Sequence, residues 1–363
     1  MNFVTLTPTQ FRKFADHHPQ KSFYQTPEIA KLRESKGWTT FYFGVKNGDK
    51  LLAAAYISAK PSFLGKSIYY CPGGPLIDYE DRELVDFFFK KLQKFAKSHN
   101  GYVIHIEPYY ELTERDRDGK PVEGGFNHQS AISNLKNLGF IAVPPESPQY
   151  SFALNIKGQD KDKLFASFKQ NTRNLISRTA RKGIKVRELD KSELSIFKQI
   201  TSSTAARRDF TDKPISYYEQ MYDLFHAKGE VKFIVAETHT EEAPVNSSTL
   251  VPLSAAMFML YGDEIIYLFS GSDEKYMHEY NAQYAIQWHM IQYALKHKFA
   301  RYNFYGIQGL PDPHKPGYGI YKFKKGFSNT ETGRVIELIG AFELPVNAPF
   351  YHLHHLLSKL KHR

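Results

Sequence analysis

The sequence predicts an α/β protein built from two similar tandem domains with mixed sheets, and three observations lead to this prediction. The chain has 363 residues, whereas a single hydrophobic core rarely grows beyond about 250 to 300 residues. Hydrophobic residues make up 42% and aromatic residues 15% of the chain, which is enough for packed cores and excludes a disordered protein. In addition, one order of strands and helix occurs twice along the chain.

The first copy of this order ends at residue 108. It opens with an extended pair over 38–57 that has Asn47-Gly48 at its turn, a dipeptide typical of tight hairpins. Segment 67–108 then reads as a strand, a glycine-containing break, a helix and a strand that ends at Glu107-Pro108. The helix is predicted from apolar residues at helical spacing, namely Leu84, Phe88, Leu92 and Phe95.

The second copy ends at residue 306. Segments 231–240 and 253–260 form the extended pair, and 265–306 reads as strand, Gly271, helix and strand. The helical spacing is carried here by Tyr284, Trp288, Ile291 and Leu295. The last strand ends at Tyr305-Gly306, where we expect the glycine to turn the chain away and leave a gap. Ligands of α/β sheets bind at such strand ends, so a site is predicted there.

This order of elements resembles the fold of the acetyl-CoA-dependent N-acetyltransferases. Those enzymes hold pyrophosphate on a loop patterned Arg/Gln-x-x-Gly-x-Gly/Ala, where free N–H groups at a helix start meet the anion. The corresponding loops here, PGGPLIDYED (72–81) and SGSDEKYMHEYN (270–281), are acidic and lack that pattern. Acetyl-CoA is therefore not expected as a cofactor, and the sequence has no phosphate-binding loop for ATP.

Three further features bear on the class of protein. Cys71 is the only cysteine, so no intrachain disulfide can form and a reducing compartment is expected. No apolar run approaches the roughly 20 residues that span a bilayer, and the N-terminus lacks the pattern of a signal peptide. The cysteine and histidine patterns of metal sites are missing too. We expect a cytoplasmic protein without a metal.

A net charge of +10 favours a polyanionic partner: nucleic acid, an anionic lipid surface or a phosphorylated substrate. Charge alone does not choose among them. The densest basic segment, 161–187, holds nine cations against one anion, Asp162. It reads about equally well as a solvated helix face or as a surface for RNA phosphates. The cations that we expect to contact RNA are Arg173, Arg178, Arg181, Lys182 and Lys185.

A second group combines cations with aromatic rings. Arg207, Arg208 and Lys213 come shortly before Tyr217 and Tyr218. Cations beside rings suit a phosphorylated sugar or nucleotide, whereas the alternative is a helix that merely packs its tyrosines.

Two single residues are candidates for chemistry. Glu107 at the end of a strand is a base, an acceptor that positions an amine, or an edge residue. Lys324 alternates with Tyr321 and Phe323, so its side chain is expected to point where that of Lys322 does, either into a cleft or into water.

Six motifs, taken together, resemble one known family. In chain order they are GGPLIDYEDRELVDFFF (73–89), HIEPY (105–109), ARKGIKVR (180–187), RRDFTDKPISYYEQM (207–221), RYNFYG (301–306) and KFKKGF (322–327). The family is the Fem family, tRNA-dependent aminoacyltransferases that build the interpeptide bridge of peptidoglycan. The resemblance covers essentially the whole chain. It implies two acetyltransferase-like (GNAT-like) domains, 1–153 plus 336–363 and 154–335, with the C-terminal tail returning to the first.

One departure from the family concerns a helical coiled-coil arm that staphylococcal members carry in the second domain. The corresponding place in this chain is only a loop, 237–254, which contains Pro244 and Pro252. The chain is therefore similar to the armless members, and it must grip tRNA without the arm.

The resemblance, carried over position by position, implies an acceptor site. Arg33 and Lys213 would contact the pyrophosphate of a muropeptide precursor, and Tyr102, Tyr217 and Phe269 would line its path. Phenylalanine stands at 269 where the armless enzyme has tyrosine, so a hydroxyl is lost there. Arginine and lysine are exchanged between positions 33 and 213, which keeps the total charge but moves the guanidinium fork.

The resemblance also implies the reacting centre. Lys324, with Phe323 before it and Tyr305 nearby, would lie close to the reacting ester, and Glu107 would occupy the position of the base. An amine of the stem peptide would attack the ester carbonyl of aminoacyl-tRNA, while Lys324 stabilises the oxyanion. Because the ester is already activated, neither ATP nor another cofactor is required.

The expected partners are aminoacyl-tRNA and a muropeptide precursor, soluble or lipid-linked, with peripheral contact to the inner membrane face. Two rival functions remain at this stage. One is a non-catalytic RNA-binding protein on the same fold. The other is a tRNA-dependent acyltransferase that acts on an amine outside the cell wall.

Overall fold

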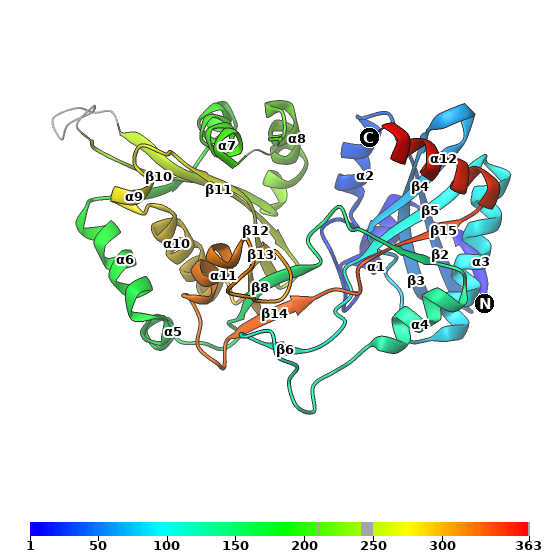
Figure 1. Cartoon of the computed structure of the whole chain (residues 1–363), viewed down its shortest axis with the longest axis horizontal. Coiled ribbons are helices and arrows are strands. Elements are labelled where there is room, and N and C mark those ends of the chain that lie inside the picture. Colours follow the sequence, from blue (N-terminus) through cyan, green and yellow to red (C-terminus); the bar gives the residue numbers. More distant parts are fainter. Residues whose placement is uncertain (209–210, 241–249, 362–363) are drawn as a thin grey trace. The chain divides into compact units, whose positions relative to one another are not determined.

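The computed structural model describes residues 1–208, 211–240 and 250–361, which divide into two compact units (Figure 1). The first unit comprises Met1–Glu114, Val122–Gln149 and Glu337–Arg363, and the second comprises Arg115–Pro121 and Tyr150–Ile336. These bounds differ from the predicted division at residues 115–121 and 150–153 and at Ile336. Both segments belong to the second unit because their strands pair within its sheet.

The first unit contains a mixed sheet with the strand order β1-β2-β3-β4-β5-β15-β7. Its strands are β1 (Asn2–Thr5), β2 (Thr39–Asn47), β3 (Lys50–Pro61), β4 (Ser67–Gly73), β5 (Gly101–Pro108), β7 (Ile141–Val143) and β15 (Ala341–Pro345). Its helices are α1 (Pro8–Ala15), α2 (Pro27–Glu34), α3 (Arg82–Ser98), α4 (Gln129–Asn137) and α12 (Ala348–Lys361).

The predicted elements of the first unit are present. The β2–β3 hairpin turns at Gly48-Asp49, one residue later than predicted, because Asn47 still pairs with Lys50, and Gly48 adopts a positive φ of 57°. Leu84, Phe88 and Leu92 of α3 are buried in the core, and Phe95 packs against it. The predicted return of the tail is confirmed, because β15 pairs antiparallel with β5.

The second unit contains a sheet with the strand order β6-β14-β8-β13-β12-β11-β10-β9. Its strands are β6 (Arg115–Asp116), β8 (Tyr150–Asn155), β9 (Lys185–Glu188), β10 (Val231–Thr238), β11 (Val251–Tyr261), β12 (Glu264–Ser272), β13 (Arg301–Ile307) and β14 (Gly333–Glu337). Its helices are α5 (Lys161–Ser167), α6 (Gln170–Arg181), α7 (Leu194–Arg208), α8 (Ile215–Phe225), α9 (Met277–Tyr280), α10 (Gln283–Lys296) and α11 (Tyr318–Lys325).

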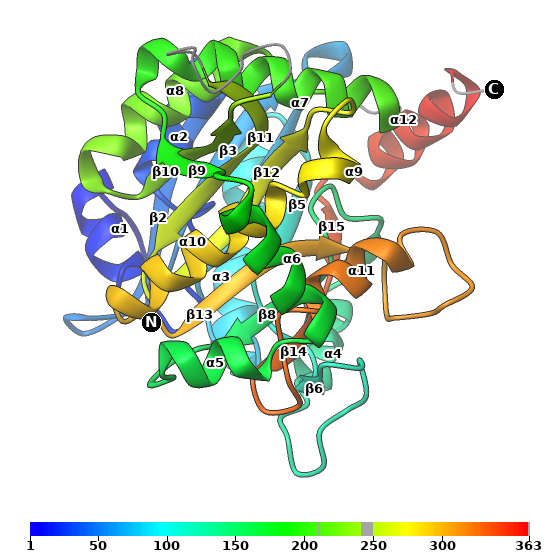
Figure 2. The same ribbon diagram turned by 90° about the vertical axis from the view of Figure 1, so that its left-hand side faces the viewer.

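The two sheets share one pairing pattern, which confirms the predicted duplication. In each sheet three antiparallel pairings precede a parallel pair, β4–β5 or β12–β13, whose strands are joined by α3 or α10. In the second unit α10 lies across one face of the sheet, and α7 and α8 cover the other (Figures 1 and 2). Alternate residues of β10 reach these two layers, with Ile234 in the α10 core and Phe233 against Phe197 of α7.

Two sequence-based details need adjustment. The buried residues of α10 are Ile286, Gln287, Met290, Ile291 and Ala294, whereas Tyr284, Trp288 and Leu295 are only partly buried against the core. The predicted loop 237–254 is too long, because residues 237–238 belong to β10 and residues 251–254 belong to β11. Residues 241–249 of this loop lie outside the described part of the chain. Within the described residues, every helix is too short or too polar to cross a bilayer.

Candidate functional site

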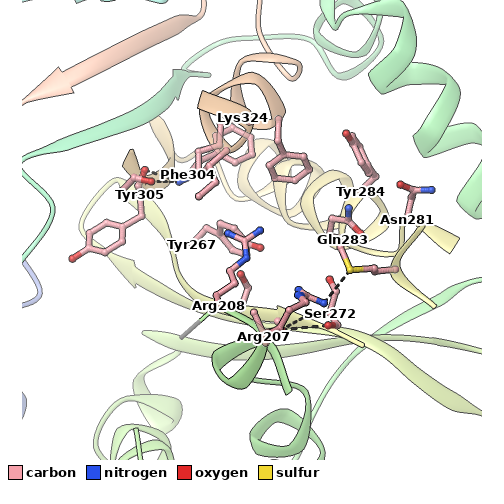
Figure 3. A pocket seen from close by; sticks show the side chains of 18 of the residues that line it. Arg207, Arg208, Tyr267, Ser272, Asn281, Gln283, Tyr284, Phe304, Tyr305 and Lys324 are labelled. Atoms are coloured by element: carbon pink, nitrogen blue, oxygen red, sulfur yellow. Dashed lines mark hydrogen bonds between the residues drawn. The ribbon is translucent and has the colours of Figure 1, made fainter. Parts of the chain in front are cut away.

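A cavity of about 570 Å³ lies in the second unit beyond the end of β13. Its wall is formed by α7, β12, the segment from α9 to α10, β13 and α11. Figure 3 shows Lys324 on one side of this cavity and Arg207 and Arg208 on the other. The site therefore occupies the strand end at which the sequence predicts it.

Lys324 is buried at the wall of the cavity. The segment around it forms a helix, α11, so Lys324 turns inward with 5% exposure while Lys322 is exposed. The Lys324 ammonium donates to the carbonyl oxygen of Tyr305 at 2.9 Å and to that of Gly306 at 2.5 Å. These two bonds use two of its three N–H donors, so one donor can serve a ligand.

The two carbonyls reach Lys324 because β13 is irregular at its end. The pairing of β13 with β8 shifts register between Asn303 and Gly306. Tyr305, and not the glycine expected from the sequence, adopts the left-handed conformation, with φ 63°. Asn303 stabilises this turn, since its side chain accepts the Tyr305 N–H at 2.7 Å and donates to Glu264 at 3.0 Å. The buried Asn303 side chain thus stabilises the chain turn that the sequence predicts at Gly306.

The protonation of Lys324 is balanced near neutral pH. Burial lowers the pKa of Lys324 to about 7. The charged form donates a third hydrogen bond, whereas the neutral form has two N–H groups, which the carbonyls occupy, and one free lone pair. The same side chain can therefore act as an oxyanion donor or as a base, depending on its charge.

Cations and rings share the rest of the cavity wall. The Arg207 guanidinium lies 3.0 Å from the sulfur of Met277, whereas Arg208 makes no ion pair or hydrogen bond to another described residue. Tyr267, Tyr284 and Phe323 also line the cavity. A cation beside aromatic faces suits a phosphorylated sugar or nucleotide, as the sequence predicts for Arg207 and Arg208.

A second group in this unit contains Lys213, Tyr217 and Phe269. The ammonium of exposed Lys213 lies 5.9 Å from the ring centre of Tyr217, whose edge meets Phe269 at 6.1 Å. None of the three lines the cavity.

Asp212, which sequence reasoning missed, fixes this segment by accepting hydrogen bonds from Lys198 at 2.6 Å and from Tyr218 at 2.7 Å. Tyr218 is buried, so it packs in the core and is not available to stack on a ligand.

Arg33, Tyr102 and Glu107 belong to the first unit. The Arg33 guanidinium lies over the rings of Trp38 and Tyr70, at 4.7 and 4.3 Å from their centres. Tyr102 is buried against Phe350 of α12 at 5.1 Å.

The Glu107 carboxylate is already engaged in the protein. Its oxygens accept the backbone N–H groups of Glu146 at 2.7 Å and Ser147 at 3.2 Å, together with His105 Nε2 at 3.2 Å. Burial alone would raise the pKa of Glu107, but these hydrogen bonds and the positive charge of His105 hold it below its usual value. A carboxylate in this state is a weak proton acceptor. The role of Glu107 as the base stays a prediction.

The basic segment divides into structural and exposed cations. Arg173 donates to the carbonyls of Ala166 and Phe168 at the end of α5, and Lys182 pairs with Glu279 at 2.8 Å. Arg178, Arg181 and Lys185 are exposed.

Sequence reasoning missed that Lys169 lies beside α11. Its backbone N–H donates to the carbonyl oxygen of Gly326, which follows that helix. Burial and then the charges of Lys325, Arg117 and Lys322 lower the pKa of Lys169.

Solved structures with a similar fold define the class of protein. The structure of FemX matches with a TM-score of 0.81 and 21% identity, over 97% of this chain and 99% of that one. A tandem GNAT protein from the clavulanic acid biosynthesis pathway matches with a TM-score of 0.54 and 9% identity, over 95% and 98% of the two chains. At these identities the likeness shows the fold, which is that of a tandem GNAT-like protein.

The sequence comparisons identify the family. The FemAB family model matches residues 6–246 and 240–359, so the chain belongs to the FemAB family. Its relatives include aminoacyltransferase FemA of Staphylococcus epidermidis, 28% identical over 99% of this chain and the full length of that protein. FemA of Staphylococcus aureus strain MRSA252 is 27% identical over the full length of both. The first alignment spans 425 positions, so that relative has residues with no counterpart among the 363 of this chain.

The strained turn at Tyr305 can be tested with a pair of variants. A non-glycine residue at a left-handed φ costs about 1 kcal/mol, a cost that Tyr305→Gly removes and Tyr305→Ala keeps. Tyr305→Gly should therefore be more stable than Tyr305→Ala by about 1 kcal/mol in urea denaturation. At Arg301, in the regular part of β13, the order should reverse, because glycine weakens a strand. Equal stability of the two Tyr305 variants would contradict the strain.

Proposed function

We propose that this protein transfers an amino acid from aminoacyl-tRNA to the stem-peptide amine of a peptidoglycan precursor and so builds the interpeptide bridge. The observation that carries this proposal is the FemAB family match, which extends over nearly the whole chain. Full-length relatives of that family are named aminoacyltransferases. The cavity around Lys324 supplies a site with the matching chemistry.

The cavity of the second unit is our candidate for the aminoacylated end of tRNA. Its rings can stack on a base or a ribose, and Arg208 can pair with a phosphate. Lys324 then lies at the wall where the ester carbonyl would be placed. The exposed cations Arg178, Arg181 and Lys185 lie on or just after α6 and are the candidates for contacts with the tRNA backbone.

The reaction needs alignment and charge stabilisation more than activation. The stem-peptide amine attacks the ester carbonyl, a C–N bond forms, and the tetrahedral intermediate places a negative charge on the carbonyl oxygen. Charged Lys324 donates its third N–H to that oxygen. The C–O bond to the ribose then breaks, and the proton released by the amine ends on the ribose hydroxyl. Holding amine and ester together contributes several kcal/mol.

The cation proposed to bind the pyrophosphate of the acceptor is Lys213, which lies beside Tyr217 and Phe269 in the second unit.

The decisive experiment offers the protein a mixture of aminoacyl-tRNAs with the nucleotide-linked and the lipid-linked precursor. Mass spectrometry should detect one precursor lengthened by an amino acid. Tight tRNA binding without any lengthened product would indicate the non-catalytic RNA-binding function. Transfer to another added amine would indicate an acyltransferase that acts outside the cell wall.

Lys324→Met should keep the fold and lower turnover on the order of 100-fold or more, the usual effect of losing one oxyanion donor. Rapid-quench measurement at saturating tRNA gives the rate, and circular dichroism reports the fold. Lys322→Met, on the exposed side of the same helix, serves as the control. A folded Lys324→Met enzyme within a few-fold of wild-type turnover would exclude Lys324 from the reaction.

The pH dependence separates the two chemical roles of Lys324. Its pKa is lowered to about 7, so the charged donor is lost as the pH rises through 7. The acceptor amine, with an ordinary pKa of about 10.4, gains reactivity over the same range. If Lys324 is the oxyanion donor, log kcat/KM should rise with a slope of roughly one below pH 7 and level off above it. A slope of roughly two below pH 7 would instead assign the neutral lysine as a base.

Lys213→Ala should raise KM for the nucleotide-linked precursor and leave KM for tRNA nearly unchanged. The pyrophosphate would lose a charge-assisted contact of about 1.5 to 3 kcal/mol. Lys296→Ala, another exposed lysine of the second unit, is the control. Equal changes in both KM values would remove Lys213 from the acceptor site.

The double variant Arg178→Ala/Arg181→Ala should weaken tRNA binding and flatten its dependence on salt. Each lost phosphate contact lowers the log–log slope by about 0.7 to 0.9. The control is Lys94→Ala/Lys97→Ala, two exposed cations at the same spacing on α3. Filter binding of tRNA across salt concentrations gives both slopes, and an unchanged slope would indicate an ordinary solvated face.

A further inference from the structure

Glu107 belongs to a row of charged groups in the first unit that are linked by hydrogen bonds. His105 and Glu107 are two residues apart on β5 and so share one face of the strand, and Glu343 stands opposite His105 on β15. His105 Nε2 lies 3.2 Å from Glu107 Oε1, and His105 Nδ1 lies 3.2 Å from Glu343 Oε1. His105 is 6% and Glu107 8% exposed. One imidazole is thus held between two carboxylates and is largely shielded from water.

The geometry determines the charge of His105. An ionised carboxylate only accepts hydrogen bonds, so both ring nitrogens must carry a proton to satisfy both neighbours. Burial alone would lower the pKa of His105, but the bonds to Glu107 and Glu343 raise it to about 9. The other group against the ring is Tyr70 of β4, edge-on at 5.0 Å, with Arg33 of α2 over it. Neither neighbour supplies an acceptor to the ring nitrogens.

The row continues beyond the two carboxylates. Glu343 Oε2 accepts from the hydroxyl of Tyr351 on α12 at 2.8 Å. At the other end, Glu107 holds the N–H groups of Glu146 and Ser147. These two residues belong to segment 144–149, which follows β7 and leads into β8, the first long strand of the second unit. We call 144–149 the linker loop.

We propose that His105 is a positioning residue: an imidazolium clamped between Glu107 and Glu343 that fixes the Glu107 carboxylate and the linker loop and makes both depend on α12. Its influence on amino-acid transfer rests on the proposed function, whereas the clamp itself does not. The clamp gives Glu107 the character of a fixed anion, suited to holding an ammonium group in place.

The first test observes the ring directly. In protein labelled with ¹⁵N-histidine, NMR should show His105 with both nitrogens protonated at pH 7.5 and should show it titrating near pH 9. Glu343→Gln should shift this titration to lower pH, because one of the two anions is removed. A neutral His105 ring at pH 7.5 would overturn the proposal.

The second test uses the linkage between protonation and stability. A histidine with a raised pKa stabilises the fold fully below its unfolded pKa of about 6.5, and this contribution is lost as the pH rises through 9. Lys324 has a lowered pKa, so its contribution to the free energy of unfolding changes with pH in the opposite direction. This contribution is the same in wild type and in a His105 variant, and it cancels when the two proteins are compared. The measured quantity is therefore the difference in denaturation midpoint between wild type and His105→Gln. It should shrink steadily from pH 6.5 to 9, and a constant difference would overturn the clamp.

The third test separates positioning from stability alone. His105→Gln should lower kcat/KM for transfer on the order of 100-fold under conditions where it stays folded, as expected when the anion that positions the substrate amine is displaced. Tyr351→Phe removes only the outermost bond, so it should cause a smaller loss in the same direction. Full activity of folded His105→Gln would overturn the positioning role. Absence of transfer in wild type, with the NMR and stability results as predicted, would instead refute the proposed function and leave the clamp intact.

Discussion

A buried ammonium group must find hydrogen-bond acceptors, and this requirement at Lys324 governs the candidate site of the second unit. A regular β13 would use its carbonyls within the sheet. The chain instead breaks the β13–β8 pairing after Asn303, and the carbonyls of Tyr305 and Gly306 are available to Lys324. The left-handed Tyr305 is the cost of this arrangement. The position of the Lys324 ammonium at the wall of the cavity follows from that break.

The duplicated fold could be predicted from the sequence because its signals are local. The β2–β3 turn and the apolar spacing of Leu84, Phe88 and Leu92 each depend on neighbours within one element. The domain bounds were less accessible. Arg115 and Asp116 of β6 pair with β14, which lies more than 200 residues later, and no local pattern indicates such a partner.

The sequence predicts which residues belong to the candidate site better than it predicts what each of them does there. Lys324 and Tyr305 do meet at one cavity, and Arg207 and Arg208 line it. The sequence could not show that the carboxylate of Glu107 is held by two backbone N–H groups of residues 146 and 147. Nor could it show which cations of 161–187 are engaged, because Arg173 and Lys182 find their partners in the tertiary structure. A residue's charge is written in the sequence, but its availability depends on the folded neighbours.

The insertion of β15 between β5 and β7 has a consequence for synthesis on the ribosome. The last residue of the second unit, Ile336, is translated before β15, which begins at Ala341. The second unit can therefore complete its sheet while the first still has a gap between two of its strands. Until β15 emerges, the edge of β5 exposes unpaired backbone groups, and such an edge can recruit other chains. A chain that terminates before Ala341 would therefore keep the whole sequence of the second unit but lack the strand that joins β5 to β7 in the first.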